Sequence, residues 1–199
     1  MRKQRLVAAG IAGIAAVALA VTGGTAVALQ DHGRDRGAGH AATASGERHA
    51  PSAVRVVRPY EPVEIGQGAL MGLLPEGRQN YVVAWGGPED FREQVEQARQ
   101  YAGDDLRPNT VSGGISSSPE HGVLFTGAFR TDVVPGRITV RTAGGTFDAS
   151  MLRLPGNPGW GTYYLDAGRT DALAAPVTVT AYAPDGTVID ELVMEHPTR

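Results

Sequence analysis

The chain has 199 residues, no cysteine and a formal net charge of −3 at pH 7. The absence of cysteine excludes disulfide bonds, thiol redox chemistry and thiolate metal sites. Residues 56–199 contain eleven Arg, no Lys and eighteen acidic residues, a net charge of −7. This charge disfavours binding to nucleic acid or to anionic lipid, because both need clustered cations.

The N-terminal residues 1–29 have the pattern of a membrane-directed helix. Arg2, Lys3 and Arg5 precede residues 6–29, which are 24 residues without a charged side chain. A helix rises about 1.5 Å per residue, so this segment is long enough to cross a hydrocarbon core about 30 Å thick. The cations stay in the cytoplasm under the positive-inside rule. We therefore predict that the rest of the chain is exported.

Two fates of this segment are compatible with its sequence. Residues 26–28, Ala-Val-Ala, form a small-x-small site of the kind that a signal peptidase cleaves, and the helix-weakening residues 22–25 precede it. The apolar run 6–21 slightly exceeds the usual length in a signal peptide, which favours an uncut anchor. We predict either a signal peptide cleaved after Ala28, which yields a secreted protein, or a single-pass anchor in the cell membrane with the N-terminus inside.

Residues 30–55 are expected to form a flexible linker. They combine mixed charges with Gly, Ala and Ser and show no apolar periodicity. A coil of this length spans roughly 25 to 30 Å, which would hold a domain away from a membrane surface. His32, His40 and His49 lie in this segment. Bringing them around one metal ion would carry a large entropic cost, so we predict no metal site there.

Residues 56–199 are expected to form one exported β-rich domain with a single helix. The helix begins at residues 88–90, Pro-Glu-Asp, and ends before Gly103, and apolar residues recur at helical spacing from Phe91 to Ala102. We expect this helix to dock against a sheet. The alternative is an amphipathic helix that binds a partner.

Short apolar runs between turn residues predict the strands, and two pairs of them predict hairpins. Residues 184–186, Pro-Asp-Gly, separate the last two strands and are typical of a hairpin turn. We predict a mostly β, sandwich-like antiparallel domain, with a meander or Greek-key half at its C-terminal end. The predicted strands are residues 81–85, 122–126, 137–141 paired with 146–152, 161–165, and 176–182 paired with 187–193.

The loop at residues 154–161, Leu-Pro-Gly-Asn-Pro-Gly-Trp-Gly, is the most distinctive motif of the chain. Phe91-Arg92 at the helix start and residues 125–130, Phe-Thr-Gly-Ala-Phe-Arg, accompany it. With these motifs the chain resembles small exported proteins of Streptomyces and related actinobacteria that share a Leu-Pro-Gly-x-Pro-Gly-Trp-Gly loop. The similarity covers most of residues 69–193. It implies an exported, tethered, β-rich protein, and it brings no catalytic residue with it, because that group has no assigned activity.

His121 is the residue on which imidazole chemistry in the domain would most plausibly depend. A polar loop with three consecutive serines, residues 116–118, precedes it, but this loop does not have the Gly-x-Ser-x-Gly pattern of a serine hydrolase. Glu120, Asp104 and Asp105 lack the spacing of known metal motifs. The sequence therefore predicts neither a metal site nor a cofactor.

Trp160, Tyr163 and Tyr164 are the candidate ligand-binding residues. They lie in or beside the proline-glycine loop, where an exposed indole could stack on a sugar or enter a pocket of a partner. The alternative is that Trp160 covers the hydrophobic core and that the glycines only let the backbone turn.

These observations predict a cell-envelope domain that binds a protein or a cell-wall glycan through its loops. Its membrane partner is the bilayer, through residues 6–29, if the segment is not cleaved. Two other functions stay open: an extracytoplasmic enzyme that uses His121, and a structural spacer.

Overall fold

The computed structural model describes residues 54–77, 80–100, 106–118, 122–168, 173 and 175–194. The predicted membrane-directed helix, the cleavage site after Ala28 and residues 30–53 of the predicted linker lie outside these residues, as does His121. Arg55, the last residue of the predicted linker, begins the first strand. Within the described ranges, no helix is long and apolar enough to span a membrane.

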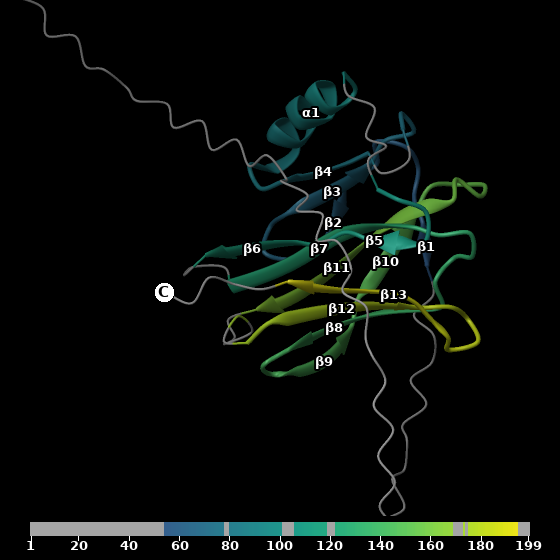
Figure 1. Cartoon of the computed structure of the whole chain (residues 1–199). Coiled ribbons are helices and arrows are strands. Elements are labelled where there is room, and N and C mark those ends of the chain that lie inside the picture. The colour runs from purple at the N-terminus through teal and green to yellow at the C-terminus, as the bar shows by residue number, and fades with distance from the viewer. Residues whose placement is uncertain are drawn as a thin grey trace, which may run out of the picture. The chain divides into compact units, whose positions relative to one another are not determined.

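A six-stranded sheet lies at the centre of the domain (Figure 1). Its strands follow the order β1-β10-β11-β7-β5, and β6 also pairs with β7. All neighbours are antiparallel except β1 and β10, which are parallel. The strands are β1 (Arg55–Val56), β5 (Thr110–Val111), β6 (Gly114–Ser118), β7 (Gly122–Arg130), β10 (Ser150–Arg153) and β11 (Trp160–Gly168).

A four-stranded antiparallel sheet packs on one face of the central sheet. Its order is β13-β12-β8-β9. Ile138, Val140 and Val179 of this sheet form one hydrophobic cluster with Phe125 and Tyr163 of the central sheet. The strands are β8 (Arg137–Thr142), β9 (Gly145–Asp148), β12 (Val177–Tyr182) and β13 (Val188–Met194).

A third sheet covers the opposite face of the central sheet. It contains β2 (Val63–Glu64), β3 (Leu70–Leu73) and β4 (Tyr81–Ala84) in that order. Met71 and Leu73 pack with Leu124, Leu152 and Trp160 of the central sheet. Side chains alternate between the faces of a strand, so the apolar run in β7 is explained by a sheet that is buried on both faces.

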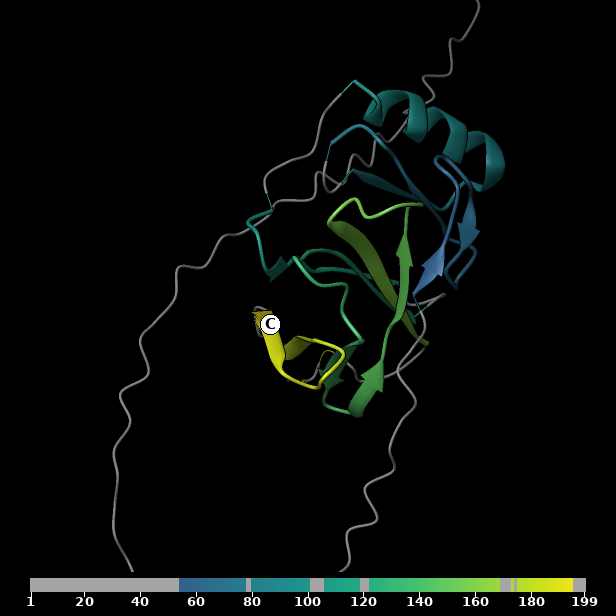
Figure 2. The same ribbon diagram turned by 90° about the vertical axis from the view of Figure 1, so that its right-hand side faces the viewer.

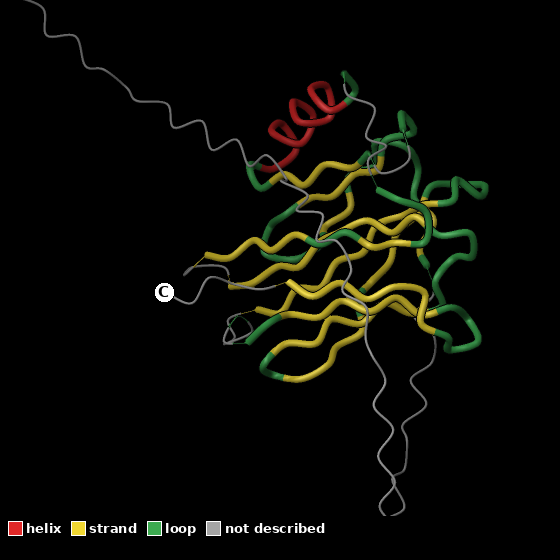
Figure 3. The backbone as a smooth tube through the Cα atoms, in the orientation of Figure 1, coloured by secondary structure: helices red, strands yellow, loops and turns green. Residues whose placement is uncertain are grey.

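The helix α1 (Gly87–Ala98) lies on the outer side of the three-stranded sheet, as Figures 1 and 2 show. Phe91 and Val95 are buried against Leu74 and Val82. A Cβ atom on Gly72 would lie 2.5 Å from the Phe91 ring, so glycine allows the helix to approach the sheet closely. The described part of the domain thus consists of one helical layer and three sheet layers (Figure 3).

Several predictions from the sequence are confirmed. The domain is mostly β with antiparallel sheets, and the predicted helix is present with Phe91 and Val95 buried. It ends at Ala98, earlier than the predicted end before Gly103, and residues 99–100 form a turn. The hairpin around residues 184–186 is present as β12 and β13. The predicted strand 161–165 is part of β11, and the predicted strand 122–126 is the first half of β7.

The predicted pairing of residues 137–141 with the strand 146–152 is confirmed for residues 146–148. The prediction of one continuous strand to residue 152 is wrong, because the structure divides it between two sheets. β9 pairs with β8 in the four-stranded sheet, and β10 pairs with β11 in the central sheet. Ala149 lies between them, buried in the core, and its N–H donates to the carbonyl oxygen of Ile138 at 2.9 Å. The two predicted hairpins and residues 161–165 therefore do not form one meander.

Candidate functional site

The three aromatic residues selected from the sequence do not form one surface. Trp160 and Tyr163 are only 3% and 0% exposed, and Tyr164 is half-buried. Trp160 and Tyr164 pack toward the three-stranded sheet, whereas Tyr163 packs toward the four-stranded sheet. Burial raises the pKa of Tyr163, whose hydroxyl donates to the carbonyl oxygen of Ser112 at 2.7 Å. Trp160 is therefore part of the hydrophobic core, which is the alternative that the sequence gave to an exposed, ligand-binding indole.

Two glycines beside these rings lie on the paired strands β7 and β11. Gly127 lies opposite Tyr163 on the neighbouring strand, and Gly161 lies opposite Phe129. A Cβ atom on Gly127 would lie 2.5 Å from the Tyr163 ring, and one on Gly161 would lie 2.5 Å from the Phe129 ring. Each strand thus places an aromatic ring over a glycine of the other strand, which is a known way to fix strand register.

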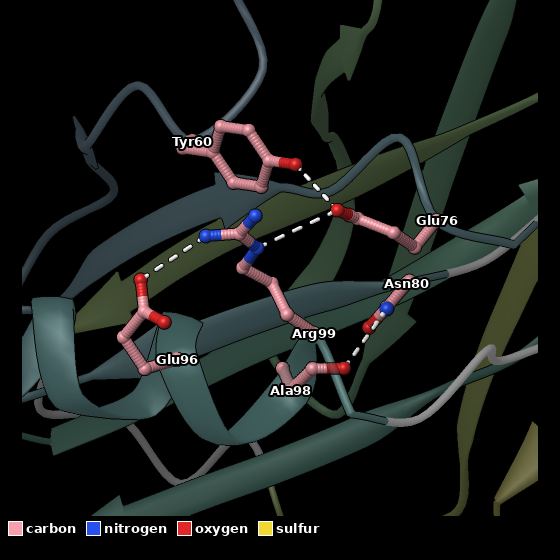
Figure 4. A network of polar contacts seen from close by, with 6 residues as sticks. All are labelled: Tyr60, Glu76, Asn80, Glu96, Ala98 and Arg99. Carbon is pink, nitrogen blue, oxygen red and sulfur yellow. Dashed lines mark hydrogen bonds and ion pairs between the residues drawn. The ribbon is translucent and has the colours of Figure 1, made fainter.

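A polar network lies at the C-terminal end of α1 (Figure 4). The Tyr60 hydroxyl donates to Oε1 of Glu76 at 2.5 Å, and Nε of Arg99 lies 3.5 Å from the same oxygen. The Arg99 guanidinium lies 5.3 Å from the centre of the Tyr60 ring and also donates to Glu96 at 3.2 Å. Asn80 donates its side-chain amide to the carbonyl oxygen of Ala98 at 3.2 Å. The network therefore connects the segments that carry Tyr60, Glu76 and Asn80 to the C-terminal end of α1.

The electrostatics of this network follow from the shared hydrogen bond. It lowers the pKa of Glu76 and raises the pKa of Tyr60, because the bond favours an ionised carboxylate and a protonated phenol. Tyr60 has a φ of 62°, a left-handed conformation that is rare for a bulky residue. Its N–H donates to the carbonyl oxygen of Leu73 at 2.9 Å, which helps to hold that conformation. The arrangement is suited to fixing α1 on its sheet.

A groove of about 500 Å³ lies where β5, β7 and β11 meet at one end of the central sheet. Arg130 ends β7, and it pairs with Thr110 of β5 on one side and with Trp160 of β11 on the other. The loops next to these strand ends form the walls. The groove is lined by Pro108, Arg130, Thr131, Asp132, Pro158 and Gly159.

Backbone and side-chain hydrogen bonds hold the walls of the groove in place. Asn109 and Asp132 bond reciprocally: the Asn109 amide donates to Oδ2 of Asp132 at 2.8 Å, and the Asp132 N–H donates to Oδ1 of Asn109 at 3.0 Å. The Thr131 N–H donates to the carbonyl oxygen of Gly159 at 3.0 Å. The Arg130 guanidinium donates to the carbonyl oxygen of Leu106 at 2.8 Å. The groove is therefore preformed.

Thr131 is the unusual residue of this groove. The residue is 5% exposed, and its hydroxyl oxygen has less than 1 Å² of accessible surface and no hydrogen-bond partner among the described residues. Leaving a buried polar group unsatisfied costs about 1 to 3 kcal/mol. The hydroxyl therefore belongs to the interior side of the groove wall, and the groups that a ligand can reach are those of the exposed residues, such as Asp132.

The groove was not predicted from the sequence. Its lining residues come from segments that are about 20 to 50 positions apart in the chain. The Pro-Gly loop was the only local signal, and it drew attention to Trp160 and not to its neighbours Pro158 and Gly159. Within the ranges that the structure describes, no three or more His, Asp or Glu side chains gather where they could hold a metal ion.

We compared the chain with protein-family models, with curated proteins and with solved structures, and none of these comparisons finds a match.

Proposed function

We propose that the chain is an exported cell-envelope domain that binds a partner in the groove at the ends of β5, β7 and β11. The observation that carries this proposal is a groove whose walls are held by hydrogen bonds and whose lining includes the exposed carboxylate of Asp132. The volume of about 500 Å³ lies within the range of roughly 300 to 1,000 Å³ that is typical of ligand sites.

A binding role suits the groove better than catalysis does. The described residues of its lining have one guanidinium, one carboxylate and one hydroxyl, and none of these described residues offers an imidazole or an amine to act as a base. Its walls are loops at the ends of strands that a packed core holds in place, a common position for recognition sites.

Site-directed photo-crosslinking in native cells tests this proposal. A photoreactive phenylalanine analogue is placed at Pro108, in the groove wall, and for comparison at Glu93 on the exposed side of α1. We expect adducts after irradiation from position 108 and not from position 93. Equal adduct yields at the two positions, or none at either, would contradict the proposal.

Asp132→Asn and Glu93→Gln form a matched pair for the same experiment. Each removes one negative charge, but Asp132 lies exposed in the groove lining and Glu93 lies on the exposed side of α1. We expect adduct yield from position 108 to fall with Asp132→Asn and to stay unchanged with Glu93→Gln.

We also propose that residues 1–29 export the domain, either as a cleaved signal peptide or as an anchor. The uncharged segment 6–29 and its preceding cations support this proposal. Cell fractionation with mass spectrometry of the N-terminus tests it. A chain in the medium that begins at Leu29 indicates cleavage, an intact N-terminus in the membrane fraction indicates an anchor, and an intact chain in the cytoplasm contradicts export.

A further inference from the structure

Two sheet edges meet beside the groove, and side chains make the contact between them. β5 lies at an edge of the central sheet, and β13 lies at an edge of the four-stranded sheet. The two strands lie side by side, but the described strands form no backbone ladder between them. Instead, the Val111 N–H donates to Oδ2 of Asp190 at 2.8 Å. The Asp190 carboxylate thus accepts the hydrogen bond that a neighbouring strand would otherwise accept.

Gly113 is the second contact of β13 with this edge. A Cβ atom on Gly113 would lie 2.6 Å from Sδ of Met194 and 3.0 Å from Cδ2 of Leu192, so glycine lets β13 pack closely there. Leu192 and Met194 pack against the hydrophobic cluster that contains Val111. We call the contact of Val111 and Gly113 with β13 the seam. One hydrogen bond to a charged group and apolar packing hold it closed.

β5 is a short strand, so the seam contributes much of what fixes its position. Its ladder to β7 has two pairs, Thr110 with Arg130 and Val111 with Phe129. A hydrogen bond to a carboxylate is roughly twice as strong as one between neutral groups. The bond to Asp190 is therefore comparable to the backbone bonds that hold β5 on its other side.

One wall of the groove continues directly from β5. Pro108 lines the groove, and Asn109 forms the two reciprocal hydrogen bonds with Asp132. Val111 follows Asn109 by two positions in the chain. A movement of β5 away from β13 would therefore shift Asn109 and weaken its bonds to Asp132.

We propose that Asp190 is a positioning residue of the groove: through Val111 it fixes β5, and opening of the seam displaces the wall that carries Pro108 and Asn109. This inference rests on the proposed function and concerns the control of that same site. It gives the C-terminal strand β13 an effect on binding, although no residue of β13 lines the groove.

Amide hydrogen exchange, measured by NMR on the full chain in detergent, tests this coupling without a ligand. The Val111 amide reports on the seam, and the Asp132 amide, which donates to Asn109, reports on the groove wall. The Val179 amide reports on global unfolding, because Val179 is 0% exposed in a strand that is paired on both sides.

Three variants separate the role of the carboxylate from a general loss of stability. Asp190→Ala removes the acceptor, and Asp190→Asn keeps a side-chain oxygen that can accept. Glu191→Ala is the control, because it removes the next carboxylate of β13, which accepts from Thr180 and lies on the other face of the strand.

With Asp190→Ala we expect the Val111 amide to exchange about ten-fold faster relative to Val179, as the loss of one hydrogen bond to a charged group predicts. The Asp132 amide should also exchange faster relative to Val179. Asp190→Asn should restore most of the protection, and Glu191→Ala should change neither amide. Faster exchange at Val111 alone would overturn the coupling, because the effect would not reach the groove. Equally faster exchange at Val179 would also overturn it, because the whole domain would then be destabilised.

Photo-crosslinking from position 108 distinguishes this inference from the proposed function. We expect the adduct yield per molecule of protein to fall several-fold with Asp190→Ala and to stay unchanged with Glu191→Ala. If the Asp132 amide responds to Asp190→Ala but position 108 gives no adducts in any protein, the coupling stands and the proposed function fails. If position 108 gives adducts whose yield Asp190→Ala leaves unchanged, this inference is overturned and the proposed function stands.

Discussion

Replacing each of the two tryptophans in turn tests whether Trp160 is a core residue. Trp160 is 3% exposed and packs between the central sheet and the three-stranded sheet, whereas Trp85, after β4, is 41% exposed. Removing a buried tryptophan side chain typically costs about 3 to 5 kcal/mol, a large part of the 5 to 15 kcal/mol by which most domains are stable. Trp85→Ala should cost about 1 kcal/mol or less, because the lost ring was partly in water.

Urea denaturation followed by far-UV circular dichroism measures both variants. We expect a much larger loss of unfolding free energy for Trp160→Ala than for Trp85→Ala. If Trp160→Ala proves too unstable to purify, the single-tryptophan variants Trp85→Phe and Trp160→Phe give a second measurement. The protein that keeps Trp160 should show blue-shifted emission and resist acrylamide quenching, and the one that keeps Trp85 should be quenched readily. Equal stability losses, or ready quenching of Trp160, would refute its place in the core.

Three further predictions concern the packing and charges of the domain. Gly127→Ala would bring a Cβ atom within 2.2 Å of the carbonyl oxygen of Ser112, so it should lower the free energy of unfolding by about 3 kcal/mol or prevent folding. Gly114→Ala is the control: the nearest atom to its Cβ lies at 3.5 Å, so the midpoint of urea denaturation should change little. Thr162→Val removes a buried hydroxyl that has no hydrogen-bond partner in the described part of the chain. We expect it to raise stability by about 1 kcal/mol and the melting temperature by about 3 °C in calorimetry, and a lower melting temperature would contradict this. The hydrogen bond from Tyr60 lowers the pKa of Glu76 below 4.5, so its contribution to stability is present above pH 4.5 and is lost as the pH falls through the folded-state pKa. The difference in stability between the wild type and Tyr60→Phe should therefore shrink as the pH falls below 4.5, and a difference that does not shrink during acidification would count against the bond.

Local signals in the sequence predicted the elements of the fold better than their assembly. The Asp-Gly turn specified the last hairpin, and apolar spacing specified α1, because both depend on residues close together in the chain. The three-stranded sheet was missed, apart from residues 81–85. Its first strand has only two residues, Val63–Glu64, which is too short to show a period. The chain also changes sheets at Ala149 with no glycine or proline to mark the bend.

The candidate site was less predictable than the fold. A groove between three loops depends on strand pairing at long range, which the sequence pattern does not reveal. Likewise, nothing in the sequence distinguishes Thr131 from the other threonines of the domain, because an unsatisfied hydroxyl is a property of its surroundings. The motif at residues 154–161 did point to the correct region, but its most prominent side chain faces the core.

The position of Trp160 nevertheless bears on the groove. Gly159 lines the groove and accepts a hydrogen bond from Thr131, and the next residue in the chain is the buried Trp160. Gly161 then packs under Phe129 of the neighbouring strand. One wall of the groove is therefore continuous with two residues that the core holds rigidly. Binding to such a preformed groove orders little of the protein's own backbone, so less of the contact energy is offset by conformational entropy lost in the groove walls. The aromatic residue of the motif would thus contribute to binding through the wall that it anchors, without touching the ligand.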